Sequence, residues 1–174
     1  MSRPVFVDKM PLNAVFLPLI AKLFPHAKIL LALRDPRDVV LSCFRRRFAM
    51  NAGMFEFTGL DTSAAYYALV MELVQVYSQK LALHLFPARH ESLIADFGGE
   101  ARRLCDFLGL EFQDEMRNFA GRAKAKNIDT PSNVQLARGL NDAGVAQWRR
   151  YAAQLEPVLP VLAPFVARFG YPEN

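Results

Sequence analysis

Four polar residues in one short stretch have the types and spacing to bind a phosphate-like anion. Arg34 follows the apolar run at 29–33, and Asp38, Ser42 and Arg46 come after it at intervals of four residues. In a helix, side chains four residues apart share one face. A guanidinium fork beside a hydroxyl suits a phosphate group, because both can donate hydrogen bonds to its oxygens. The alternative is that Arg34 and Asp38 form a buried ion pair that only ties the apolar run to the helix.

A strand, a tight turn and a helix must position these residues. The run at 29–33 is short enough to be a buried strand. Asp35 predicts the N-cap of a helix and Pro36 its first residue, while Asp38 in the first turn suits the helix dipole. Apolar residues then recur at helical spacing and are expected to pack inward: Val39, Val40, Cys43 and Phe44. This geometry presents free backbone N–H groups to an anion.

The positive charge of the chain is concentrated beside this unit. The 174 residues carry a net charge of +4, and residues 28–50 alone hold six basic and two acidic side chains, which equals the whole surplus. A local surplus favours an anionic ligand at this point over a basic surface that follows a nucleic acid. The triplet Arg45-Arg46-Arg47 leaves nucleic-acid binding as a further reading, but no aromatic platform flanks it. We therefore expect no nucleic-acid partner.

Composition indicates one domain, residues 1–174, in a reducing compartment. The chain is 52% hydrophobic with 14 Phe, which is ample for a packed core. No apolar run reaches the length of a membrane span, and the N-terminus lacks the pattern of a signal peptide. Cys43 and Cys105 lie in apolar helical patterns and are expected to be free thiols, as in a cytoplasmic protein. Three scattered histidines predict no metal site.

The order of the remaining elements predicts a βαβα fold with a parallel sheet and a right-handed crossover. Further strands are expected at 4–8 and 90–94, and a loop at 51–62. The polar segment at 120–139 is expected to be a long loop of the kind that usually carries function. Helices are expected at 14–24, 63–85, 100–108, 113–119, 141–153 and 155–169, the last of them interrupted by prolines.

Five segments in this order resemble the sulfotransferase superfamily, which transfers sulfuryl groups from 3′-phosphoadenosine 5′-phosphosulfate (PAPS). The likeness is greatest to bacterial sulfotransferases of the kind often fused to tetratricopeptide repeats, and more distant to protein-tyrosine sulfotransferases. FPHAKILLALRDPRDVVLSCF at 24–44 resembles the signature that binds the 3′-phosphate. The other four segments are VDKMPLN at 7–13, RHESLIADF at 89–97, RRLCDFLGLEF at 102–112 and TPSNVQLARGLNDAGVAQWRRY at 130–151.

The resemblance implies roles for individual residues. Arg34, Ser42 and Arg46 would hold the 3′-phosphate of the cofactor. Lys9 would neutralise charge on the transferring sulfuryl group, and Ser132 falls where the protein-tyrosine branch has a serine near the reacting centre. Four residues would lie along the nucleotide: His90, where that branch has a tyrosine, and Gln135, Arg138 and Asn141. The acceptor would be a hydroxyl group of a peptide, carbohydrate or small molecule.

One part of the family pattern is missing from this sequence. The family begins with a strand and a Gly-rich, Ser/Thr-containing loop that cradles the 5′-phosphosulfate, and nothing before Pro4 or later matches it. We therefore expect a P-loop-NTPase-like three-layer α/β sandwich with a parallel sheet, truncated at the N-terminus and rich in helices in its C-terminal half. An apolar sheet edge would be exposed, which favours a homodimer or a separate N-terminal segment.

Two functions remain open at this point. The chain is either a PAPS-dependent sulfotransferase, incomplete as it stands, or a non-catalytic module that binds adenosine 3′,5′-bisphosphate. Saturable binding that depends on the 3′-phosphate is expected of both, and transfer of a sulfuryl group separates them.

Overall fold

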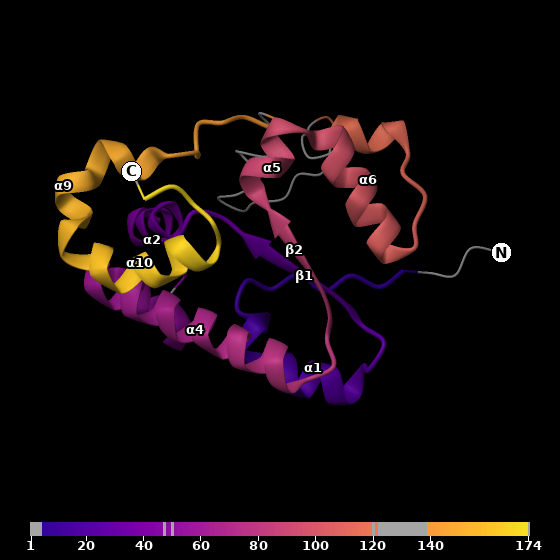
Figure 1. Cartoon of the computed structure of the whole chain (residues 1–174), viewed down its shortest axis with the longest axis horizontal. Coiled ribbons are helices and arrows are strands. Elements are labelled where there is room, and N and C mark those ends of the chain that lie inside the picture. Colours follow the sequence, from indigo (N-terminus) through magenta and orange to yellow (C-terminus); the bar gives the residue numbers. More distant parts are fainter. Residues whose placement is uncertain (1–4, 47, 50, 120, 122–138, 174) are drawn as a thin grey trace.

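The computed structural model describes residues 5–46, 48–49, 51–119, 121 and 139–173. In this part of the chain two parallel strands, β1 (Lys28–Leu33) and β2 (His84–Arg89), form a sheet, and helices make up most of the rest (Figure 1). Lys28 lies opposite His84, and Leu33 lies opposite Arg89. The fold is therefore α/β with a parallel sheet, as the sequence predicted.

Helices precede, connect and follow the two strands. Before β1 come η1 (Asn13–Phe16) and α1 (Leu17–Leu23). The crossover to β2 contains α2 (Pro36–Arg45), α3 (Ala52–Phe55), η2 (Glu56–Thr58) and α4 (Leu60–Lys80). After β2 come α5 (His90–Ala95), α6 (Phe97–Leu108) and η3 (Asp114–Asn118). The chain continues through η4 (Gln147–Tyr151), α9 (Ala152–Leu155), η5 (Glu156–Val158) and α10 (Leu159–Arg168).

The start of α2 has the capped geometry that its sequence predicts. The Asp35 side chain accepts a hydrogen bond from the backbone N–H of Arg37 at 2.9 Å, and Pro36 is the first helical residue. Val40 and Leu41 are buried, whereas Phe44 is 42% exposed, so the prediction that Phe44 packs inward was wrong. The buried residues of α2 all lie in its first two turns, and Phe44 lies beyond them in the last turn.

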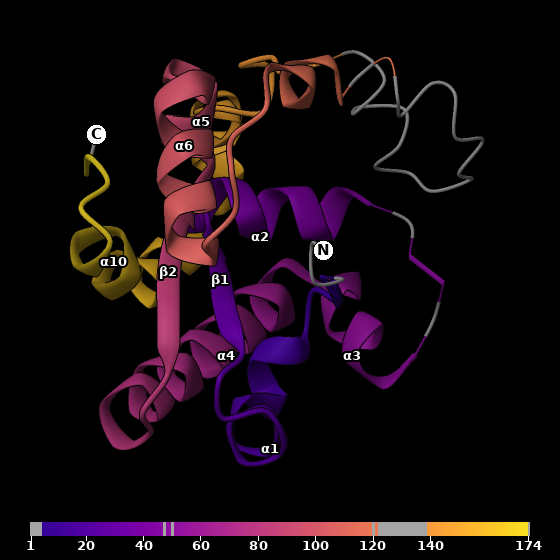
Figure 2. The ribbon, with the colours of Figure 1, turned by 90° about the vertical axis from the view of Figure 1, so that its right-hand side faces the viewer.

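The second strand begins earlier than predicted. The helix expected at 63–85 ends at Lys80, where the N–H of Leu81 bonds to the Tyr77 carbonyl and the backbone becomes extended. Residues 84–89 then pair with β1, although they include Pro87. Proline is tolerated because β2 is an edge strand in the described sheet. The strand expected at 90–94 is instead helix α5, which begins directly at the end of β2 (Figure 2).

The N-terminal segment differs from its predicted strand. Residues 5–8 form no strand, and Val5, Phe6 and Val7 are 61%, 92% and 77% exposed. The apolar pattern suits a strand, but a strand needs a neighbour for its backbone groups, and no described segment pairs with this one. The helix expected at 14–24 starts as the 3-10 helix η1, and α1 begins only at Leu17, with Pro18 in its first turn.

Other local predictions were confirmed where a turn or a proline governs them. Gly109 ends α6 in the left-handed conformation, with φ 71°. The C-terminal helix is divided into α9, η5 and α10.

The helix expected from 141 begins only at Gln147, because Ala146 has a left-handed φ of 53° that interrupts it.

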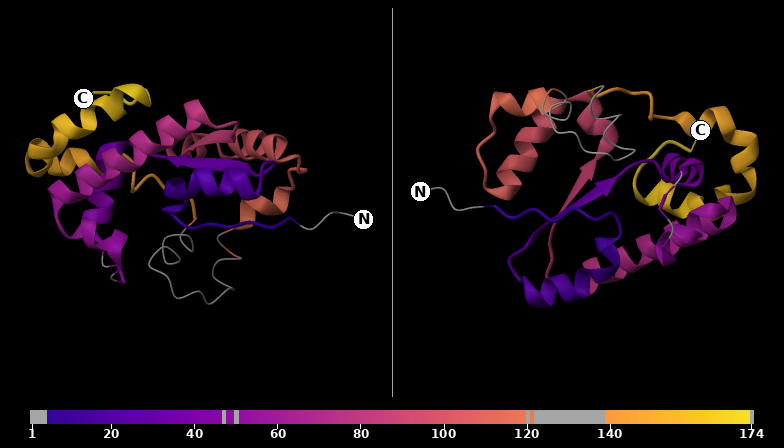
Figure 3. Two further views of the ribbon diagram at one scale, coloured as in Figure 1. Left: turned by 90° about the horizontal axis from the view of Figure 1, so that it is seen from below. Right: turned by 180° about the vertical axis from the view of Figure 1, so that it is seen from behind.

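The main core lies where α2, α4 and the C-terminal helices meet. Val40, which was predicted to pack inward, lies there with Leu41, Ala64, Trp148 and Leu162. A second cluster joins Leu33 and Met71 to Phe165 beneath β1. Viewed from behind, the end of the chain returns beside α2 (Figure 3). Cys43 and Cys105 are free thiols, as predicted, and no helix of the described residues is long and apolar enough to cross a membrane.

Candidate anion-binding site

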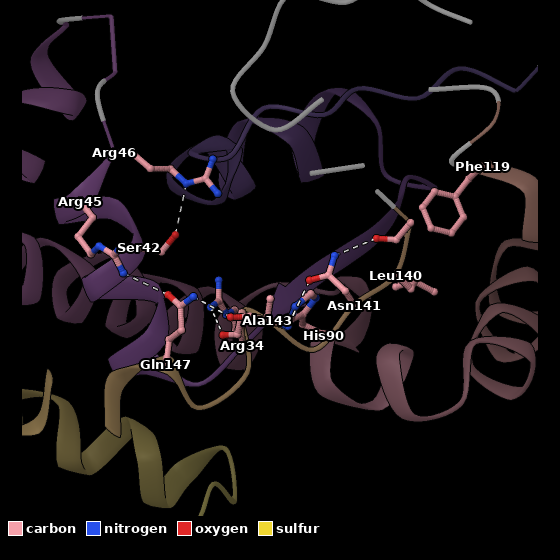
Figure 4. A pocket seen from close by; sticks show the side chains of 12 residues that line it. Arg34, Ser42, Arg45, Arg46, His90, Phe119, Leu140, Asn141, Ala143 and Gln147 are labelled. Carbon is pink, nitrogen blue, oxygen red and sulfur yellow. Dashed lines mark hydrogen bonds between the residues drawn. The ribbon is translucent and has the colours of Figure 1, made fainter. Parts of the chain in front are cut away.

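A pocket of about 540 Å³ lies beyond the carboxyl end of β1. Its walls come from the end of β1, the outer half of α2, the start of α5, and the segment 139–147 (Figure 4). Three of the described lining residues are arginines, namely Arg34, Arg45 and Arg46. No acidic residue occurs among the described residues that line the pocket. The carboxyl ends of parallel strands are a usual place for ligands in α/β folds. The arrangement is suited to an anion.

Arg34 projects from the end of β1 and has a donor to spare. Its Nη2 donates to the carbonyl of Gly144, and the same atom lies 4.0 Å from Asp38 Oδ2. Its Nε is buried and has no hydrogen-bond partner among the described residues. A buried donor without a partner costs free energy, and an acceptor bound in the pocket would satisfy it. The residues present therefore fit a phosphate oxygen at this position.

Asp38 is a buried residue that links Arg34 to the backbone of Trp148. Its side chain is fully buried, and Oδ1 accepts a hydrogen bond from the backbone N–H of Trp148 at 2.8 Å. Burial raises the pKa of this carboxyl, while the Trp148 N–H and Arg34 act to lower it. The ion pair between Arg34 and Asp38 and the anion pocket thus coexist, so the two readings of the sequence do not exclude each other.

The last turn of α2 supplies the other donors. Arg46 Nε lies 3.4 Å from Ser42 Oγ, to which it donates. Arg45 Nη1 donates to Gln147 Oε1 at 3.3 Å, and its guanidinium lies 5.0 Å from the ring centre of Tyr151. The spacing of four residues between Ser42 and Arg46 brings them together as the sequence indicated.

His90 and Asn141 complete the predicted residues that line this pocket. Burial, and then the positive charge of Arg34, lowers the pKa of His90 below its usual 6.5. Asn141 Nδ2 donates to the Gly139 carbonyl, and its Oδ1 accepts from the N–H of Ala143. The structure thus gathers Arg34, Ser42 and Arg46 with these two residues around one cavity.

The remaining predicted residues do not line this pocket in the described structure. Lys9 is exposed within the N-terminal segment and is not among the lining residues. Ser132, Gln135 and Arg138, with most of the predicted loop at 120–139, lie outside the described residues. Among the residues that are described, no group of three or more potential metal ligands occurs.

Sequence reasoning missed residues that come from far along the chain. Gly144 offers its carbonyl to Arg34 across 110 positions, and a Cβ on Gly144 would lie 3.2 Å from Arg34 Nη2. Gln147 closes the pocket against Arg45. No local pattern marks either residue, because both act through partners that only the tertiary structure supplies.

Glu91, which follows His90 in α5, is an acidic residue next to the pocket lining. Its Oε1 accepts a hydrogen bond from the Asp35 N–H and its Oε2 accepts one from the Tyr171 hydroxyl, both at 3.0 Å. Glu91 is not among the residues that line the pocket. Its carboxylate is thus engaged within the protein, away from the cavity.

A parallel α/β fold with an arginine-rich pocket at its strand end is suited to an anionic ligand. The chain belongs to the sulfotransferase family, because the sequence model of that family matches residues 1–114. The predicted resemblance is thereby confirmed.

Individual relatives agree with this family. The chain is 26% identical to a putative protein-tyrosine sulfotransferase of Caenorhabditis elegans, covering 97% of this chain and 66% of the relative. It is 26% identical to protein-tyrosine sulfotransferase 1 of Danio rerio, covering 94% of this chain and 47% of that relative. An uncharacterized protein of Aquifex aeolicus is 25% identical over 99% of this chain and 22% of its own length. The chain therefore spans between about a fifth and two thirds of these relatives.

Proposed function

We propose that this protein acts as a sulfotransferase that uses PAPS, and that the pocket beside α2 receives the 3′-phosphate of the nucleotide. The observation that carries the proposal is the convergence of Arg34, Ser42 and Arg46 on one cavity, with a buried Arg34 donor that has no partner in the part of the chain that the structure describes. A guanidinium fork and a hydroxyl together match the oxygens of a phosphate monoester. Family membership supports the same nucleotide.

The residues have separate tasks in this proposal. Arg34 and Arg46 neutralise the 3′-phosphate, Ser42 donates a further hydrogen bond, and His90 and Asn141 lie beside the nucleoside. Gln135 and Arg138 are proposed to cover the nucleotide, and Lys9 and Ser132 to act at the reacting centre. PAPS supplies the sulfuryl group. Positioned cations and donors stabilise the spread charge of such a transfer.

The proposed acceptor is a hydroxyl group, with a peptide tyrosine favoured. Two of the relatives are named as protein-tyrosine sulfotransferases, which supports a phenolic hydroxyl over a carbohydrate. A second candidate function is binding of adenosine 3′,5′-bisphosphate without transfer. It is favoured by the position of Lys9, which is exposed and does not line the pocket.

Calorimetric titration with adenosine 3′,5′-bisphosphate tests the proposed site, with AMP as the matched ligand that lacks the 3′-phosphate. We expect saturable binding of the bisphosphate and much weaker binding of AMP. Equal affinity for both ligands, or no binding by folded protein, would overturn the assignment. A transfer assay with PAPS and a tyrosine peptide then separates the enzyme from the binding module.

Affinity for the bisphosphate is expected to rise as the pH falls below about 6.5. His90 is largely neutral above that pH, because burial and Arg34 lower its pKa, and a bound phosphate favours the protonated imidazole. The negative charges of Glu91 and Asp38 raise the pKa of His90, as a bound phosphate would. Titrations between about pH 5 and pH 8 measure this dependence.

The matched control for the pH dependence is His90→Gln with the same ligand, since the phosphate itself titrates near a pKa of about 6. The difference in affinity between wild type and variant should grow at low pH. A constant difference across the range would remove His90 from the site.

We also propose that the chain self-associates through its N-terminal apolar surface. Phe6 and Val7 in the extended segment are exposed, as are Leu19, Leu23 and Phe24 in and after α1. Such surfaces mark interaction sites in soluble proteins. Sedimentation velocity at increasing concentration should show a growing dimer fraction, reduced by Phe6→Ser with Leu23→Ser. Val161→Ser, on the distant α10, serves as the control, and a monomer at every concentration would contradict the prediction.

A further inference from the structure

Residues 171–173, here called the strap, pack against the beginnings of α2 and α5. The Tyr171 hydroxyl donates to Glu91 Oε2 at 3.0 Å. Arg37 donates from Nη1 to the Glu173 carbonyl at 3.0 Å and from Nη2 to the Pro172 carbonyl at 2.6 Å. Each residue of the strap is therefore held by a side chain from one of these two helices: Glu91 in α5 or Arg37 in α2.

Glu91 connects the strap to the pocket. Its Oε1 accepts a hydrogen bond from the backbone N–H of Asp35, the residue after Arg34. Glu91 itself follows His90 in the chain. One carboxylate therefore bridges the two backbone segments that carry Arg34 and His90 into the pocket, and Tyr171 holds that carboxylate from the other side.

Arg37 connects the segment at 139–147, which forms another wall of the pocket, to the same network. It forms a fork with Asp35, from Nε to Oδ1 at 3.0 Å and from Nη2 to Oδ2 at 2.7 Å. Its guanidinium lies 3.7 Å from the ring centre of Trp148, and the backbone N–H of Trp148 donates to Asp38 Oδ1. Trp148 follows Gln147, which lines the pocket. The network thus joins α2 and its N-cap residue Asp35 to α5 and to η4.

We propose that Glu91, held by Tyr171 of the strap, is a positioning residue that sets the placement of Arg34 relative to His90 in the anion pocket. It touches no ligand and acts through the Asp35 N–H and the start of α5. The proposal deepens the proposed function, because its first readout is binding of the 3′-phosphate nucleotide. The hydrogen bond from the Asp35 N–H to Glu91 joins the two segments, and the bond from Tyr171 fixes the position of the same partly buried carboxylate; both are 3.0 Å long.

Paired variants separate positioning from charge. Glu91→Gln loses the charge but keeps an oxygen for the Asp35 N–H, and its amide can donate to the Tyr171 oxygen. Glu91→Ala loses the charge and both hydrogen bonds. We expect Glu91→Ala to weaken binding of adenosine 3′,5′-bisphosphate about five- to 150-fold, the cost of leaving buried donors unsatisfied, and Glu91→Gln to change it far less. Tyr171→Phe keeps the ring against Arg89 and should weaken binding about two- to tenfold.

A purely structural role would change stability without changing affinity. Met71→Ala provides the matched control, because Met71 is buried in the cluster with Leu33 and Phe165 and has no polar side-chain group that could take part in the hydrogen bonds of the network. It should lower the melting temperature and leave the affinity of the folded protein unchanged. If Glu91→Ala behaves in the same way, the proposal is wrong. If Glu91→Ala does not fold, Tyr171→Phe carries the same comparison.

A second readout needs no nucleotide. The pKa of His90 is measured by NMR in both Glu91 variants, with its signal assigned from His90→Gln. Both variants lack the carboxylate charge, so a difference between them reports position. Release of α5 in Glu91→Ala should move His90 away from Arg34 and raise its pKa above that in Glu91→Gln. Identical values would overturn the positioning role, whereas a difference without any binding of the bisphosphate would reject only the proposed ligand.

Discussion

Replacing Arg34 with alanine is expected to weaken binding of adenosine 3′,5′-bisphosphate by about 1.5–3 kcal/mol, the range for a hydrogen bond to a charged group. That loss corresponds to roughly ten- to 150-fold in the dissociation constant. The reason is that Arg34 lines the pocket and holds a buried Nε donor for which the described residues supply no partner. Ser42→Ala should cost less, about 0.5–1.5 kcal/mol, because a neutral hydroxyl makes the weaker bond. Calorimetric titration of the folded variants measures both losses.

Two further variants make this result interpretable. Arg34→Lys keeps a positive charge near Asp38 but lacks the guanidinium fork, so it should bind the bisphosphate weakly while remaining more stable than Arg34→Ala. Arg168→Ala removes an arginine that pairs with Glu72 away from the pocket, and its affinity should equal that of the wild type. An unchanged affinity in Arg34→Ala would remove the 3′-phosphate from this pocket. A larger loss for Ser42→Ala would reverse the ranking.

Replacing Arg37 with alanine is expected to lower the free energy of unfolding by about 3–5 kcal/mol, the usual cost of removing one partner of a buried ion pair. The side chains of Arg37 and Asp35 are only 4% and 9% exposed. The substitution leaves the Asp35 carboxylate without its fork, the Pro172 and Glu173 carbonyls without donors, and Trp148 without its stacked cation. Urea denaturation measures the loss.

Arg168→Ala is again the matched control, since it breaks an ion pair of 3.0 Å with Glu72 whose side chains are 32% and 51% exposed. Solvent screens such a pair, so the expected loss is about 0–1 kcal/mol. Similar losses in the two variants would show that the buried network does not stabilise the fold.

Local structure around the candidate site could be predicted because its causes lie within a few residues. Asp35 and Pro36 start α2 through a side-chain cap and a fixed backbone angle, and Gly109 ends α6 because it tolerates a left-handed φ. The spacing of four residues brings together Ser42, in the last turn of α2, and Arg46, directly after that helix. The family, too, could be recognised from short segments in order.

Strand pairing could not be predicted to the same extent. Residues 5–8 have the apolar pattern of a strand, but they have no described partner and form none. Residues 84–89 contain Pro87, and their pattern continues that of α4, yet they pair with β1 along their whole length. Whether a segment becomes a strand depends on the backbone beside it, which the sequence of the segment does not contain.

The sequence by itself determined the candidate anion-binding unit of this protein: a strand followed by Arg34, a capped helix that carries Ser42 and is followed by Arg46, and a local surplus of positive charge. Only the tertiary structure decided what surrounds that unit. Gly144 reaches Arg34 and Trp148 reaches Asp38 across 110 positions, and Tyr171 reaches Glu91 across 80. The physical reason is that buried polar groups require partners, and in this fold those partners come from distant segments that meet only when the chain closes around α2.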